Sequence, residues 1–211
     1  MNSDIINCED DDGCHDNATC TDGDGSYTCA CNDGFTGDGF NCLDHCENNT
    51  CGDDQTCNTL PDMFQCACNN SDKFLVNGSC TSRGSHVLIN ELTLNKVYQP
   101  DYDDPNSMAY KAFVVEIESQ VLAYLQNSNE TSNLDIYGVK VISLRNGSVV
   151  ANLTAASNLE TLSTSSVENG INVGIDNGNL SSIAATGTVQ AQGISKSCKY
   201  TNILFDPLNT S

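Results

Sequence analysis

The sequence has no tryptophan, three histidines and only eight lysines and arginines, against 28 aspartates and glutamates in 211 residues. The formal net charge of −20 repels the phosphates of nucleic acids and anionic lipids, so neither is an expected partner. No apolar run approaches the roughly 18 residues of a membrane span, and Met1 is followed by acidic polar residues rather than by a signal peptide. We therefore expect no membrane contact within this segment, and we expect it to be a fragment of a longer secreted or membrane-anchored protein.

Cysteine, in contrast, is abundant in one part of the chain. Twelve of the 13 cysteines lie between Cys8 and Cys80, and the last is Cys198. Such density is typical of small modules stapled by disulfides in an oxidising compartment, which predicts an extracellular protein. Zinc is the alternative, but the stretch lacks paired C-x2-C knuckles and H-x3-5-H spacing. Cys198 could begin a further disulfide module, bridge to another chain, or have lost its partner to truncation.

The twelve cysteines form two ladders of six. Their separations are 5, 5, 8, 1 and 10 residues in the first ladder and 4, 5, 8, 1 and 11 in the second. A repeat of about 38 residues with one common core indicates a single module used twice. In this spacing, and in the run GFTGDGFNC that ends at Cys42, residues 4–80 resemble the EGF family. We assign residues 1–43 and 44–81 to two EGF-like modules.

Six cysteines allow fifteen pairings, and the spacing leaves them all open. The resemblance implies that the first cysteine pairs with the third, the second with the fourth and the fifth with the sixth. The implied disulfides are Cys8–Cys20, Cys14–Cys29, Cys31–Cys42, Cys46–Cys57, Cys51–Cys66 and Cys68–Cys80.

The first module also carries oxygen-bearing residues suited to calcium. Asp22 and Tyr27 fit the pattern C-x-[DN]-x4-[FY]-x-C-x-C, and Asp4 and Asn7 precede Cys8. These positions resemble the calcium-binding EGF subclass. The resemblance implies one Ca²⁺ held by Asp4, Asn7 and Asp22, with backbone carbonyls near Ile5, Gly23 and Ser26. The alternative is a polar turn beside a frayed terminus.

Two substitutions bear on this calcium site. Ile6 stands at a position that is often Asp or Asn in the subclass, and Asn7 stands where Glu or Gln is commoner. Fewer charged ligands lower the affinity for calcium, so we expect weak binding. In the second module Thr59 occupies the position that corresponds to Asp22. We therefore expect no calcium there.

Beyond a linker at residues 82–85, strand and helix patterns alternate over residues 86–192. The pattern predicts a strand in VLINELTLN, a helix in SMAYKAFVVEIESQVLAYLQN, strands in YGVKVISLR and SVVANLTA, a helix beginning near Ser157, and a strand in SSIAATGTVQAQ. This β-α-β-β-α-β order corresponds to an α+β, ferredoxin-like sandwich with its helices on one face. Residues 193–211 are expected to be a C-terminal tail.

Residues 86–192 resemble the SEA domain of membrane mucins. The resemblance rests on the opening strand, on YDDPNS at 102–107 and on RNGSVV at 145–150 between the middle strands. Many SEA domains cleave themselves at a Gly-Ser bond, which here implies attack of the Ser148 hydroxyl on the Gly147 carbonyl and hydrolysis of the resulting ester. No base for Ser148 is evident, so backbone strain would drive the reaction. The alternative is an ordinary type I′ hairpin, and Ala151 stands where cleaving members commonly have valine.

Nine N-x-S/T sequons agree with an extracellular location: Asn17, Asn48, Asn69, Asn77, Asn129, Asn146, Asn152, Asn179 and Asn209. We interpret the chain as part of a mucin-like or adhesion-receptor-like surface glycoprotein whose ligands would be extracellular proteins or glycans. A secreted matrix protein with an uncleaved SEA domain is the alternative. We expect no enzyme beyond single-turnover self-cleavage, because His86 is the only histidine outside the modules and a Ser-His-Asp triad needs one beside a serine.

Overall fold

The computed structural model describes residues 8, 13–47, 51–145, 149–180 and 187–194. The chain divides into two units, the first made of Met1–Ser82 and Tyr98–Glu118 and the second of Arg83–Val97 and Ser119–Ser211. The first division thus falls where the cysteine-rich part of the sequence ends. The long helix is shared between the units.

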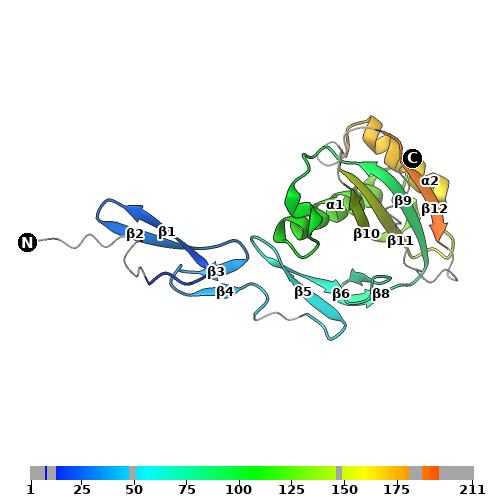
Figure 1. Cartoon of the computed structure of the whole chain (residues 1–211). Coiled ribbons are helices and arrows are strands. Elements are labelled where there is room, and N and C mark those ends of the chain that lie inside the picture. Colours follow the sequence, from blue (N-terminus) through cyan, green and yellow to red (C-terminus); the bar gives the residue numbers. More distant parts are fainter. Residues whose placement is uncertain (1–7, 9–12, 48–50, 146–148, 181–186, 195–211) are drawn as a thin grey trace, which may run out of the picture. The chain divides into compact units, whose positions relative to one another are not determined.

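Each cysteine ladder forms a longer hairpin followed by a short one (Figure 1). In the first module, β1 (Ala18–Gly23) pairs with β2 (Ser26–Cys31), and β3 (Phe35–Gly37) pairs with β4 (Cys42–Asp44). In the second module, β5 (Gln55–Thr59) pairs with β6 (Phe64–Cys68), and β7 (Phe74–Val76) pairs with β8 (Ser79–Thr81). The repeat in the sequence is therefore also a repeat in the structure.

Disulfides replace a core in these modules. Among their described residues, the buried apolar side chains are limited to Cys42, Leu60 and Phe74. So small a core does not stabilise a module of about 40 residues, whereas each bridge contributes about 3 kcal/mol by restricting the unfolded chain. The pairs in the structure are those that the EGF resemblance implies: Cys8–Cys20, Cys14–Cys29, Cys31–Cys42, Cys46–Cys57, Cys51–Cys66 and Cys68–Cys80.

The rest of the first unit holds the start of the long helix. An aromatic cluster surrounds η1 (Pro100–Asp103): Tyr98 meets Tyr102 edge to face at 5.8 Å, and Tyr102 stacks on Phe113 at 4.7 Å. Phe113 and Ile117 are buried. Apolar residues at three- and four-residue spacing therefore form the inner face of the helix, as the sequence pattern indicates.

The second unit contains a four-stranded sheet. Its strands are β9 (Ser85–Thr93), β10 (Ile136–Arg145), β11 (Val150–Ser157) and β12 (Gln190–Ile194). They lie in the order β10-β11-β9-β12, and every neighbouring pair is antiparallel. Along the chain, α1 (Met108–Asn127) and the short η2 (Ser132–Leu134) follow β9, and α2 (Thr164–Asp176) follows β11. Hence the elements follow one another in the order β-α-β-β-α-β.

The two helices contact each other within the second unit. Leu125 of α1 and Ile171 of α2 are fully buried. The Tyr124 hydroxyl donates a hydrogen bond to the Gly170 carbonyl at 2.8 Å. A Cβ at Gly174 would lie 2.5 Å from the Tyr124 ring, so the glycine permits this close approach.

The expected start of the second helix near Ser157 was wrong. Ser157 ends β11, is buried, and donates a hydrogen bond from its hydroxyl to the Leu134 carbonyl at 2.5 Å. The helix starts instead at Thr164, where the Ser163 side chain accepts the Ser166 N–H at 3.2 Å. Several serines in this stretch could cap a helix. Ser157 is part of β11 and therefore does not cap α2, and Ser163 does.

The edge strand β12 is held by side chains of α2. Asn172 Oδ1 accepts the Val189 N–H at 2.9 Å, just before β12, and Glu168 Oε2 accepts the Ala191 N–H at 3.0 Å. Backbone donors at a sheet edge are sites of unwanted pairing between chains. Here α2 satisfies two of them from within the fold.

Candidate functional site

The β1–β2 hairpin positions Asp22, the expected calcium ligand. Asp22 lies opposite Tyr27, and Gly23 lies opposite Ser26. Asp22 Oδ1 accepts the backbone N–H of Cys8 at 2.8 Å. The carboxylate therefore faces the chain directly after Asn7.

The other expected side-chain ligands, Asp4 and Asn7, lie outside the described residues, as does Ile5. Asp22, Gly23 and Ser26 come together at the end of one hairpin, where Gly25 has a φ of 81° in the turn. Among the described residues, no three His, Cys, Asp or Glu side chains are grouped as metal ligands. The described half of the site thus offers one carboxylate and nearby backbone carbonyls, which suit a hard cation.

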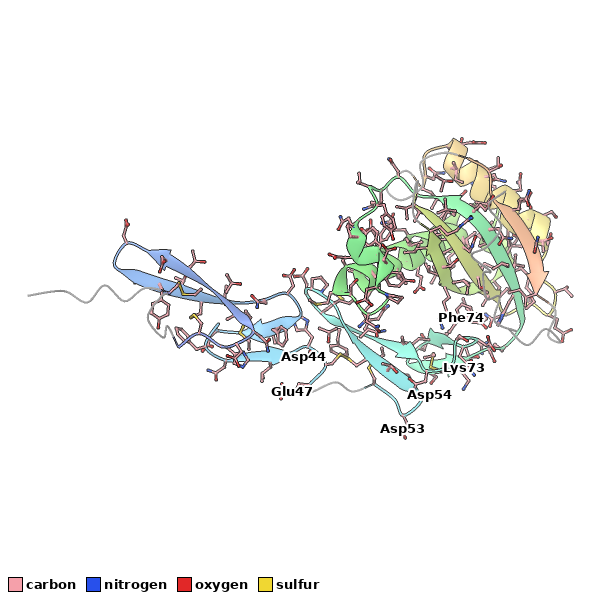
Figure 2. The ribbon with its side chains drawn as sticks, in the orientation of Figure 1. Asp44, Glu47, Asp53, Asp54, Lys73 and Phe74 are labelled. Atoms are coloured by element: carbon pink, nitrogen blue, oxygen red, sulfur yellow. A yellow bond between two sulfur atoms is a disulfide. The ribbon has the colours of Figure 1, made fainter. Side chains whose placement is uncertain are left out.

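The second module places a different arrangement at the corresponding position. Thr59 donates a hydrogen bond from its hydroxyl to Asp44 Oδ1 at 2.9 Å, and the same oxygen accepts the Cys46 N–H at 2.6 Å. Figure 2 shows Asp44 at the end of β4, where the first module passes into the second. Asp44 was not expected as a site residue, because its partner Thr59 follows 15 residues later in the chain.

The same module contains an ion pair on its surface. Lys73 Nζ lies 3.7 Å from Asp54 Oδ2, and both residues are labelled in Figure 2. Both side chains are more than one-third exposed. Such a pair contributes little stability because water and salt screen it.

The expected cleavage site, Gly147 and Ser148, lies outside the described residues together with Asn146. The chain on both sides of it is described. Arg145 pairs with Val150 across the β10–β11 ladder, so four residues separate the paired positions. Val149 is fully buried, and its carbonyl accepts the Leu94 N–H at 2.7 Å. Arg145 forms an ion pair with Glu91 at 3.1 Å.

Two β-bulges lie close to this hairpin. The β11–β9 register shifts between Ala151 and Leu153, and the β10–β11 register shifts between Val141 and Ser143. Glu91, beside the first shift, has a φ of 61°. Bulges bend a strand and increase its twist.

Asn152 joins the two bulges through its side-chain amide. Its Oδ1 accepts the Glu91 N–H at 3.0 Å, and its Nδ2 donates to Ser143 Oγ at 3.0 Å. Thr154, the third residue of this sequon, is 3% exposed. The half-buried side chain that the sequence marks for a glycan is therefore hydrogen-bonded to both neighbouring strands.

Among the other described sequons, that of Asn129 also has a buried third residue, Thr131. Asn17 is half-buried, whereas Asn69, Asn77, Asn129 and Asn179 are exposed. Asn48, Asn146 and Asn209 lie outside the described residues, and so does Cys198.

A family model matches part of the chain. Residues 8–42, which span the first cysteine ladder, match the model described as EGF domain. No helix in the described ranges has the length and apolarity needed to cross a membrane. An EGF domain lies at residues 8–42, the six disulfides fit EGF-like modules, and together they point to an extracellular modular protein.

Proposed function

We propose that this chain is an extracellular segment of a mucin-like or adhesion-receptor-like surface glycoprotein. Residues 1–43 are a calcium-binding EGF-like module, residues 44–81 are an EGF-like spacer, and residues 86–192 are a SEA domain. That domain cleaves itself between Gly147 and Ser148, and strand pairing keeps the two products associated.

The strand order supports a ferredoxin-like SEA domain. β11 lies between β9 and β10, the strands that flank α1 in the sequence. Likewise, β9 lies between β11 and β12, the strands that flank α2. Two β-α-β units that each enclose a strand of the other form the split arrangement of ferredoxin-like sandwiches.

A comparison within the chain supports cleavage over an ordinary hairpin. Asn-Gly-Ser occurs twice, at 77–79 and at 146–148. At the first copy Val76 pairs with Ser79, and φ is 48° at Asn77 and 78° at Gly78, which fits a relaxed two-residue type I′ turn. At the second copy the paired residues are Arg145 and Val150, so four residues separate the paired positions instead of two.

The observation that carries the proposal is the anchoring on both sides of the second copy. The ladder pairing of Arg145 with Val150 and the hydrogen bond of the buried Val149 to Leu94 hold the flanking chain to β11 and to the segment that follows β9. Folding of the sheet can therefore impose strain on the intervening peptide bonds, and a distorted backbone can store a few kcal/mol.

That strain would be released by an N-to-O acyl shift. Ser148 Oγ attacks the Gly147 carbonyl carbon, the Gly147–Ser148 C–N bond breaks, and the hydroxyl proton passes to the new amine. Water then hydrolyses the ester, which yields the Gly147 carboxylate and the free Ser148 hydroxyl. The reaction consumes one water and occurs once per chain.

The test is intact mass spectrometry and a denaturing gel of the complete 211-residue chain after folding. We expect two fragments ending at Gly147 and beginning at Ser148, and a single intact chain for Ser148→Ala. Ser79→Ala is the matched control, since it alters the other Asn-Gly-Ser copy and leaves cleavage unchanged. An uncut wild-type chain with all six disulfides formed would refute self-cleavage.

The calcium proposal rests on Asp22, whose carboxylate lies beside Cys8. Asp4, Asn7 and Asp22 would hold the ion with carbonyls near Ile5, Gly23 and Ser26. Calorimetric titration with Ca²⁺ should show one weak site that Asp22→Ala removes. Asp24→Ala, which changes the adjacent turn, should keep the binding heat. Equal heats in the wild type and Asp22→Ala would contradict the assignment.

A further inference from the structure

The link between the two modules is short and hydrogen-bonded on both sides. Leu43, Asp44 and His45 are the residues between Cys42 and Cys46. The His45 N–H donates to the Gly34 carbonyl of the first module at 3.1 Å. His45 Nδ1 lies 3.2 Å from the Leu60 carbonyl oxygen of the second module. The linker is thus bonded to both neighbours.

The modules also bond to each other directly. The Gly34 N–H donates to the Pro61 carbonyl at 2.9 Å. Gly34 has a φ of +88°, and a Cβ there would lie 2.9 Å from the Thr59 methyl group. Only glycine meets both requirements without strain, since the left-handed backbone and the close approach coincide.

Asp44 is the polar centre of this contact. Its Oδ1 accepts two hydrogen bonds, one from Cys46 N–H at 2.6 Å and one from the Thr59 hydroxyl at 2.9 Å. Leu60, the next residue after Thr59, is 4% exposed. A carboxylate that accepts two donors beside a buried side chain forms stronger hydrogen bonds than a neutral acceptor does.

The corresponding positions of the first module have the opposite chemistry. Asp22, two residues after the third cysteine of its ladder, accepts the N–H of Cys8, the first cysteine. In the second module the residue two after the third cysteine is Thr59, a donor, and the N–H of Cys46 goes to Asp44 instead. Where one module presents a carboxylate that suits a cation, the other has a hydroxyl bonded to a carboxylate.

From these contacts we propose that residues 34, 44–46 and 59–61 form a fixed joint between the modules that needs no metal ion. The Thr59 hydroxyl donates a hydrogen bond to the Asp44 carboxylate and so takes the place that a cation would otherwise occupy. The backbone bonds of Gly34 to Pro61 and His45 then fix one module on the other. This inference stands apart from calcium binding and from cleavage, since neither contributes to the contacts.

The test is amide hydrogen exchange of the complete chain, read at Gly34 and His45, in Ca²⁺ and in EGTA. The Gly34 amide is protected only while Pro61 remains in place, so it reports the joint. We expect the same protection in both solutions. Thr59→Val removes the hydroxyl while keeping the shape, and it should accelerate exchange at both amides about tenfold or more.

Two variants serve as controls. Thr59→Ser keeps the hydroxyl and should restore the protection. Thr56→Val, in the same strand, removes a hydroxyl that bonds to Asn69 inside the second module, and it should leave Gly34 unaffected.

Faster exchange at Gly34 in EGTA, or equal exchange in the wild type and Thr59→Val, would overturn the proposal. If Thr59→Val also exposes the amides of the β5–β6 hairpin, the comparison of the wild type in Ca²⁺ and EGTA decides alone.

Discussion

The side chain of Asn152 has two incompatible assignments, one as a glycan acceptor and one as a structural amide. Its Nδ2 and Oδ1 bond to Ser143 and Glu91 across both register shifts. Removing that amide would leave a backbone donor without its partner, which costs about 1–3 kcal/mol. The amide is thus used by the sheet itself.

We therefore expect no glycan on Asn152 in the folded protein. Peptide mapping after enzymatic deglycosylation in heavy-oxygen water should label the exposed Asn77 and leave Asn152 unlabelled. Asn77→Gln should remove one glycan mass, whereas Asn152→Gln should remove none. A labelled Asn152 in protein whose β11 amides are protected from exchange would contradict this expectation.

Among the described residues, Tyr98 has a clearly altered ionisation. Its hydroxyl donates a hydrogen bond to Asp103, and this bond raises the pKa of Tyr98 to about 12. A raised pKa favours the neutral phenol. The stabilising contribution is therefore fully present below the ordinary value near 10 and is lost as the pH rises through about 12.

Asp103→Asn should move the titration of Tyr98 down toward the ordinary value near 10. The measurement is an NMR titration of the chain labelled at tyrosine carbons, with Asp101→Asn as the matched control in the same short helix. A titration of Tyr98 that is unchanged in Asp103→Asn would assign the shift to another cause.

At the scale of elements, the contact of α2 with β12 determines how the sheet ends. Asn172→Ala would leave the Val189 N–H without its acceptor. Val189 is only 2% exposed, so water does not readily replace that acceptor. We expect the free energy of local opening to fall by about 1–3 kcal/mol, measured by native-state amide exchange at β12. Gln190→Ala, at an exposed position, is the control and should change exchange little. Equal exchange in both variants would show that Asn172 does not hold the edge.

The first three strands and the long helix could be predicted from periodicity, because alternation and three- to four-residue spacing follow directly from backbone geometry. The last strand, expected in SSIAATGTVQAQ, is instead β12 at Gln190–Ile194. Periodicity could not predict the bulges. Glu91, with a φ of 61° beside one bulge, donates its N–H to Asn152, which lies 61 positions away in the sequence. The start of α2 was misplaced for a similar reason, since the cap was chosen by the burial of Ser157.

The same limit applies to the candidate sites. Asp22 could be found because a local pattern of cysteines and one aromatic residue marks it. Asp44 could not be found in this way, because its partner Thr59 follows 15 residues later and the contact depends on how the modules meet. Likewise, Asn-Gly-Ser is typical of a two-residue turn, whereas four residues separate the paired Arg145 and Val150. That difference depends on the strand register, which a local motif does not determine.

At the scale of the whole molecule, two kinds of stabilisation share one chain. The modules depend on six disulfides, whereas the sheet and helices of the second unit bury apolar side chains such as Ile89, Leu153 and Ile171. Reduction should therefore affect the two parts differently.

We expect a reducing agent without denaturant to abolish amide protection in β1–β8 while protection in β9–β11 persists. Exchange measured by mass spectrometry, with the oxidised chain as reference, provides the readout. Loss of protection in all strands together on reduction would contradict this division, and so would modules that stay protected.

The order β10-β11-β9-β12 has a mechanical consequence. Strands that precede residue 148 in the chain alternate in space with strands that follow it, so each of the three ladders joins one strand from either side. If the chain is cleaved there, the strands of the two fragments alternate across the sheet. Separating the two fragments therefore requires that all three ladders break.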